Sequence, residues 1–74
     1  MRPYANSGNS GVLAYETGGD WITILFRGGG KYLYTAASAG AATIGTMKNL
    51  AEAGQGLNSF INRFVRSNYE QKLA

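Results

Sequence analysis

The stretch Gly56-Leu57-Asn58-Ser59-Phe60-Ile61-Asn62-Arg63-Phe64-Val65-Arg66 decides the fold, because one periodicity accounts for nearly all of it. Its apolar residues recur at i, i+3, i+4, i+7 and i+8, the stripe of a helix that buries one side: Leu57, Phe60, Ile61, Phe64 and Val65. The polar residues fall on the opposite side: Ser59, Asn62, Arg63, Arg66 and Glu70. We expect Asn58 to cap the first turn. The stretch therefore predicts a helix that is apolar below and basic above, and that covers an upstream element.

The composition indicates one small globular domain with a weakly charged surface. The chain has 74 residues, and its apolar share of 45% is ordinary for a folded protein. Its charged share of 15% is low against the usual level of about 25%. Such a surface favours contact with a partner or with a second copy. The net charge of +3 permits attraction to polyanions without requiring it.

The residue types that are missing exclude several kinds of chemistry. The chain has no cysteine and no histidine, which excludes disulfides and thiol chemistry and removes the commonest general base and metal ligand. The four carboxylates form no catalytic pair: Glu16, Asp20, Glu52 and Glu70. We therefore expect no enzyme, no metal and no cofactor.

The sequence is also expected to lack a signal peptide and a membrane segment. Met1-Arg2-Pro3 is not followed by an apolar segment, and no apolar run approaches the roughly 20 residues that span a bilayer. We therefore expect a cytoplasmic protein.

Glycine-bounded apolar runs predict a three-stranded antiparallel meander. Residues 1–10 have no periodicity and are expected to form a flexible tail before a single domain over residues 11–74. Strands are predicted at about Gly11 to Thr17, at Trp21 to Phe26 and at Lys31 to Thr35. The turns between them contain Gly18-Gly19-Asp20 and Gly28-Gly29-Gly30.

Two helices are predicted after the strands. Ser38 is expected to cap a helix from about Ala39 to Ala53, which Gly54 ends. Its expected buried stripe is Ile44, Met47, Leu50 and Ala51, with Gly45 placed against the sheet. The last helix is expected to fray near Ser67, with Tyr69 packing back separately. The predicted fold is α+β, in the order β-β-β-α-α with both helices on one sheet face.

The loop length between the second and third strands sets which side chains meet. A three-residue loop opposes Arg27 with Lys31, Phe26 with Tyr32 and Ile24 with Tyr34. It places five side chains on the core face: Ile22, Ile24, Phe26, Tyr32 and Tyr34. A four-residue loop places Trp21 and Leu25 on the face of the two tyrosines instead. We favour the first arrangement, although it sets two cations opposite each other.

A set of aromatic residues, glycines and one asparagine follows a pattern known from a protein family. Its members are Tyr15, Phe26, Gly28 or Gly29, Tyr32, Tyr34, Gly54 and Asn58, followed by a final helix and Tyr69. In this pattern the segment from about Val12 to Tyr69 resembles the KTSC domain, a small bacterial domain also found at the C-terminus of some lysyl-tRNA synthetases. Ala36-Ala37-Ser38 stands where that family tends to carry a Val-Pro helix start. The resemblance implies an accessory role in RNA binding.

Three sets of residues are candidate polyanion contacts, each with a structural alternative. Arg27 and Lys31 flank a glycine loop that could contact phosphate, or that is simply a hairpin turn. Asn62, Arg63 and Arg66 could follow a phosphate backbone, or form a solvated helix face with an Arg66–Glu70 pair. The aromatic residues Trp21, Tyr32 and Tyr34 could stack on bases, or serve as core and edge packing.

Two functions remain open. The favoured one is a non-enzymatic module that binds nucleic acid, RNA in preference, through Arg27, Lys31, Asn62, Arg63 and Arg66, with help from Trp21. The alternative is a protein-interaction or self-associating module, with a protein partner or a homodimer, that uses the outer sheet face. That alternative gains weight if Trp21, Leu25 and Leu33 all point outward, since they would form an apolar patch.

Overall fold

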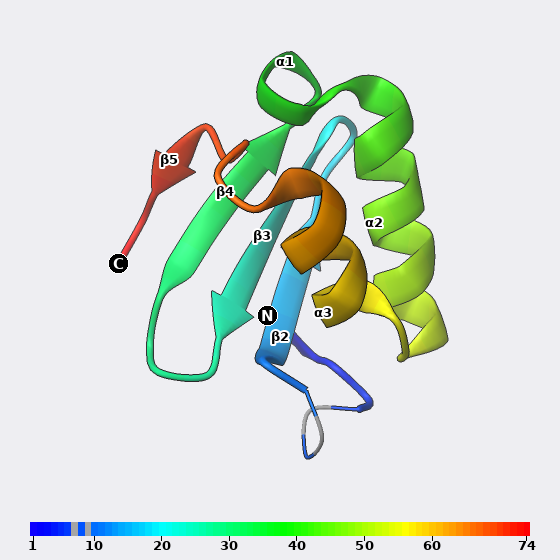
Figure 1. Cartoon of the computed structure of the whole chain (residues 1–74), viewed down its shortest axis with the longest axis vertical. Coiled ribbons are helices and arrows are strands. Elements are labelled where there is room, and N and C mark those ends of the chain that lie inside the picture. Colours follow the sequence, from blue (N-terminus) through cyan, green and yellow to red (C-terminus); the bar gives the residue numbers. More distant parts are fainter. Residues whose placement is uncertain (7, 9) are drawn as a thin grey trace.

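The three strands expected from the apolar runs form the centre of an antiparallel sheet (Figure 1). The computed structural model describes residues 1–6, 8 and 10–74. The central strands are β2 (Val12–Thr17), β3 (Trp21–Phe26) and β4 (Lys31–Thr35). Two short strands that the sequence analysis did not anticipate extend the sheet at its edges: β1 (Arg2–Pro3) and β5 (Gln71–Lys72). The sheet therefore has five strands in the order β1-β2-β3-β4-β5, not three, within a small α+β domain.

The first residues of the chain do not behave as the predicted tail. Arg2 and Pro3 pair with Tyr15 and Ala14 of β2, and Tyr4 is only 2% exposed. Residues 7 and 9, also part of the predicted tail, lie outside the described residues. The prediction was wrong for 2–4 because a single aromatic residue without periodicity gives no sequence signal that it is buried.

The predicted core face is confirmed, but the predicted pairs are wrong. Ile22 pairs with Tyr34 and Ile24 with Tyr32, which displaces the strands by two residues from the favoured register. Because side chains alternate with a period of two, this displacement leaves the same residues on the core face. The turn is wider than expected: Phe26 N–H donates to the Gly30 carbonyl at 2.8 Å, and Gly28 has a φ of 99° that favours glycine. The wider turn also avoids opposing Arg27 with Lys31.

The first predicted helix is divided in two. Thr35, not Ser38, is the N-cap, and the two residues form a reciprocal capping box at the start of α1 (Ala36–Ala39). Gly40, with a φ of 97°, then separates α1 from α2 (Ala41–Ala53). Gly54 ends α2 in the left-handed conformation, as predicted.

The last helix begins as expected but widens at its end. It consists of α3 (Leu57–Phe60) followed by a π-helical turn, η2 (Ile61–Val65), in which Arg66 N–H donates to the Ile61 carbonyl. Asn58 is not its cap, because Gly56 occupies the N-cap position. The wider turn stacks residues four apart, so Leu57, Ile61 and Val65 are buried. Phe64, predicted to be buried with them, is 63% exposed.

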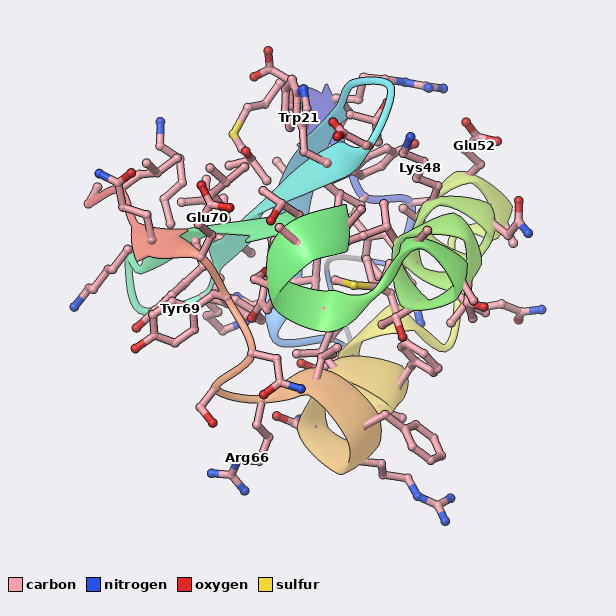
Figure 2. The ribbon with its side chains drawn as sticks, turned by 90° about the horizontal axis from the view of Figure 1, so that it is seen from above. Trp21, Lys48, Glu52, Arg66, Tyr69 and Glu70 are labelled. Carbon is pink, nitrogen blue, oxygen red and sulfur yellow. The ribbon has the colours of Figure 1, made fainter. Side chains whose placement is uncertain are left out.

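The core lies between the helical segments and the sheet face that carries the even-numbered residues of β3 and β4. Its central members are Val12, Tyr15, Ile22, Ile24, Tyr34, Ile44, Met47, Ala51, Leu57, Ile61 and Val65, with Tyr4 from the N-terminal segment. Lys48 ties α2 to the sheet, since its ammonium donates to the carbonyls of Gly18 and Gly19 in the β2–β3 turn (Figure 2). No helix of the described residues lies over the opposite sheet face, which carries Trp21 (Figure 2).

Candidate functional site

An aromatic cleft opens where the end of the β3–β4 hairpin meets η2 and the segment that follows it. Its volume is about 290 Å³. One wall carries the aromatic rings of Phe26, Tyr32, Tyr34 and Tyr69. The other carries Ile61, Asn62, Arg66 and Ser67. The lining of the cleft therefore combines aromatic rings with an asparagine and an arginine, which suits a planar ligand that bears negative charge.

Three edge-to-face contacts hold the rings of the cleft in place. The Tyr69 ring lies 4.7 Å from that of Tyr32 and 6.3 Å from that of Tyr34, between centroids. The Phe26 ring lies 5.6 Å from that of Tyr32. Such pairs stabilise each other by about 0.5–1.5 kcal/mol beyond their burial. Because Tyr69 is still 37% exposed, part of its ring is open to a ligand.

The chain brings Tyr69 to the cleft by leaving the helix and joining the sheet. Val65 ends η2, and Glu70 N–H donates to the Leu33 carbonyl at 2.7 Å as the chain enters β5. Tyr69 consequently lies on the helix side of β4, while Glu70 lies on the other side (Figure 2). The expectation that Tyr69 packs back is confirmed. The predicted Arg66–Glu70 helical pair is wrong, because the helix ends at Val65 and Glu70 accepts a hydrogen bond from the Thr35 hydroxyl at 2.7 Å.

The polar groups of the cleft are positioned by the π-helical turn. Asn62 and Arg66 are four residues apart at the wide turn, and both contribute to the lining of the cleft. The Tyr34 hydroxyl donates to the Arg66 carbonyl at 3.4 Å, which links the sheet to the end of η2. The Lys72 ammonium lies 5.8 Å from the Tyr32 ring centre and adds a second cation nearby.

One phenol of the cleft is harder to ionise than a free tyrosine. Desolvation, together with the neighbouring phenols of Tyr32 and Tyr69, raises the pKa of Tyr34 from 10.0 to about 12. The Tyr34 hydroxyl is a neutral hydrogen-bond donor at physiological pH, as an unshifted phenol also is, and the raised pKa extends this neutral range into alkali.

The remaining predicted contacts lie outside the cleft. The Arg63 guanidinium lies 5.5 Å from the Phe64 ring centre, on the solvent side of η2. Arg27 donates to the Ser10 carbonyl from Nε and Nη2, both at 3.3 Å. Lys31 pairs with Leu25 at the start of β4. Of the six residues predicted to bind nucleic acid, only Asn62 and Arg66 are brought together in the cleft.

The stacking platform of Trp21, Tyr32 and Tyr34 is not formed. The register places both tyrosines on the helix side of the sheet, while Trp21 pairs with Thr35 and points to the other side (Figure 2). The indole rests against Gly18, where there is no room for a Cβ. Trp21, Thr23 and Leu25 alternate along β3 and therefore share the outer face. Leu33 lies on the same face, because it pairs with Thr23.

That outer face carries a second hollow, which we call the outer groove. Its volume is about 410 Å³. Apolar walls come from Trp21, Leu33 and Ala37, and Thr23 and Thr35 lie between them. Asp20 and Glu70 complete its lining. The groove is therefore an apolar trough whose ionisable groups are both carboxylates.

Two contributors to the cleft were missed by the sequence reasoning. Phe26 was assigned to the core and Tyr69 only to packing, although together they form much of the aromatic wall. The sequence did carry a signal for Tyr69, because an aromatic residue that follows a helix can pack against the tyrosines of a strand.

Within residues 1–6, 8 and 10–74, no three carboxylates gather closely enough to hold a metal ion. Nor does any described helix have the length and apolar character needed to cross a bilayer.

Comparison with known proteins adds no relative. No family model, no curated protein and no solved structure matches this chain. The resemblance to the KTSC domain stays a prediction.

Proposed function

We propose that this chain is a small, non-enzymatic binding module that takes single-stranded nucleic acid, RNA in preference, at the aromatic cleft. The observation that carries the proposal is the meeting of Tyr32 and Tyr69 with Asn62 and Arg66 around one opening. Proteins bind single-stranded nucleic acids with these two elements, aromatic rings for the bases and cations for the phosphates. A cytoplasmic location and kinship with the KTSC domain belong to the same proposal.

Each group has a distinct role in the proposed complex. The exposed part of the Tyr69 ring stacks on a base, a contact worth about 1–3 kcal/mol by alanine substitution. The Arg66 guanidinium pairs with an adjacent phosphate, and Asn62 hydrogen-bonds to sugar or base edges. Lys72, beside the Tyr32 ring, neutralises a second phosphate. A duplex is a poorer ligand because its bases are already stacked.

The test is an amide-shift titration of isotopically labelled protein with short mixed-sequence RNA and with duplex DNA, at low and moderate salt. We expect shifts at Asn62, Arg66 and Tyr69 with RNA, weaker shifts with duplex, and a fall in affinity as salt rises. Tyr69→Ala should weaken RNA binding by about tenfold. Trp21→Ser, on the other side of the sheet, is the matched aromatic control and should leave RNA binding unchanged.

The proposal fails if RNA shifts no amide around the cleft, or if Tyr69→Ala and Trp21→Ser have equal effects on affinity. Shifts confined to the glycine turn would instead support phosphate contact by Arg27 and Lys31, the predicted site that the cleft does not include.

A second candidate function is a protein-interaction or self-associating module that uses the outer sheet face. It is favoured by the outward placement of Trp21, Leu25 and Leu33 and by the apolar outer groove beside them. Its test is the mass of the protein in sedimentation as concentration rises, with Trp21→Ser as the variant that should reduce association.

A further inference from the structure

The most exposed large apolar side chain among the described residues is Phe64, at 63%. Its ring packs against Phe60, 5.1 Å away between centroids, and under the Arg63 guanidinium at 5.5 Å. Arg63 and Phe64 thus form a projecting apolar ring flanked by a cation, which we call the Phe64 knob. A phenylalanine left in water forgoes much of the free energy that its burial would release, so the knob is suited to a partner.

The outer groove has the complementary shape and charge. Trp21 and Leu33 provide apolar walls of the size that an aromatic ring fills. Asp20 and Glu70 are both acidic, although the chain as a whole carries +3. The Thr35 hydroxyl donates to Glu70 Oε1 at 2.7 Å and holds that carboxylate at the groove. A groove of this kind prefers an apolar group that carries a positive charge beside it.

The geometry points to a second copy of this chain as the occupant: the Phe64 knob of one molecule seats in the outer groove of the next. Phe64 then contacts Trp21, and Arg63 faces the carboxylates of Asp20 and Glu70. Both surfaces lack a cover within the described chain, and one contact covers both. This inference goes beyond RNA binding, since neither Phe64 nor the outer groove belongs to the aromatic cleft. It rests on the second candidate function, self-association through the outer sheet face, and names the part of the second copy that fills the groove.

The two surfaces lie on opposite sides of the sheet, and this determines the type of assembly. In Figure 2, Trp21 lies on one side of the sheet, and the π-helical turn, coloured orange, lies on the other. Each molecule can therefore offer its knob while its own groove is filled. Such a head-to-tail contact is heterologous and continues beyond a dimer unless it closes into a ring.

The association is expected to be weak. One aromatic ring and one charge cluster bury far less than the roughly 800 Å² per partner of a stable interface. We therefore expect dissociation at about millimolar concentration, and sedimentation at high protein concentration should show a mass that rises past that of a dimer. A monomer at every concentration would overturn the inference.

The position of Trp21 allows a sharper test, because it is the only tryptophan in the chain and lies in the groove. Phe64→Ser removes the knob and keeps the outer groove with Trp21, whose fluorescence reports on it. Trp21→Ser alters the groove, has no tryptophan and keeps the knob. Neither variant should associate alone. Titrating the second into the first should shift Trp21 emission to the blue and form a species of two chains that grows no further.

Three matched variants complete the experiment. Adding Arg63→Glu to the Trp21→Ser partner should weaken the titration by about tenfold, because it opposes like charges. Adding Ala37→Arg to the Phe64→Ser partner should abolish the shift; Ala37 is exposed, so this change fills the groove while sparing the core. A Trp21→Ser, Phe64→Ser partner should give no shift. Far-UV circular dichroism confirms that each variant folds.

The inference is overturned if the two single variants do not bind each other while both are folded. It is also overturned if the partner that lacks both side chains still shifts the emission, because another surface then occupies the groove. Loss of association in Phe64→Ser with RNA binding intact would separate this contact from the aromatic cleft. Binding of RNA to the groove itself, seen as a blue shift on adding RNA alone, would contradict it as well.

Discussion

The backbone N–H of Leu57 donates a hydrogen bond to the phenol oxygen of Tyr4 at 3.2 Å, across 53 positions of the chain. Leu57 begins α3, where the first amides of a helix have no partner within the helix. Gly56 has no side chain with which to satisfy them. A buried tyrosine from the N-terminal segment thus serves as the cap of the last helix and fixes the position from which the aromatic cleft is built.

Loss of the Tyr4 hydroxyl should therefore destabilise a distant element. Tyr4→Phe keeps the ring but leaves the buried Leu57 N–H without its acceptor, which costs about 1–2 kcal/mol of the free energy of unfolding. Urea unfolding measures the loss, and amide exchange should show faster opening of α3. Tyr69→Phe, which removes a more exposed hydroxyl, is the matched control. Equal stability of Tyr4→Phe and the unchanged protein would contradict this role.

Two helix glycines should respond to alanine in opposite directions. Gly45 lies inside α2 with nothing within 4 Å of an added Cβ, so Gly45→Ala should stabilise the domain by up to about 1 kcal/mol. Gly54 has a φ of 78°, and its Cβ would lie 2.7 Å from that of Ala5, so Gly54→Ala should destabilise by more than about 1 kcal/mol. Thermal unfolding of both variants decides the matter. Destabilisation by Gly45→Ala would show that its surface is covered.

The contrast at Gly45 also shows what sequence patterns could and could not give. The expectation that Gly45 sits against the sheet was wrong, since it is exposed on α2. Helical spacing correctly predicted Ile44, Met47 and Ala51 as buried. It did not reveal the break at Gly40, because a glycine inside a helical pattern is usually tolerated at modest cost.

Strand faces were easier to predict than strand partners. The alternation of apolar residues predicted that Ile22, Ile24 and Tyr34 face the core. This prediction does not depend on the exact strand pairing, because a displacement by two residues leaves every side chain on the same face. The turn length is set by the conformations of Gly28 and Gly29, which composition alone does not specify. For the cleft, the sequence supplied Asn62 and Arg66 as candidates. Their meeting with Tyr69 depends on the π-helical turn, which has no clear sequence signature.

The raised pKa of Tyr34 makes the domain less stable in alkali. Below pH 10 the phenol is protonated in both states, so its contribution is complete. Between about pH 10 and pH 12 the unfolded chain releases the proton while the folded chain retains it, and stability falls by up to about 1.4 kcal/mol per pH unit. Tyr34→Phe should flatten this part of the profile of unfolding free energy against pH. Parallel profiles for the two proteins would refute the assignment to Tyr34.

Arg66 and Arg63 are expected to differ in their contributions to nucleic-acid binding, although the sequence pattern predicted both as contacts. Arg66 lines the aromatic cleft, whereas Arg63 lies over the Phe64 ring outside it. Arg66→Gln should weaken short single-stranded RNA by about tenfold and lower the slope of log affinity against log salt by about one. Arg63→Gln, which removes the same charge from the same turn, should change affinity by less than about twofold. Fluorescence anisotropy over a salt series measures both. Equal losses for the two variants would mean that RNA follows the outer helix face and not the cleft.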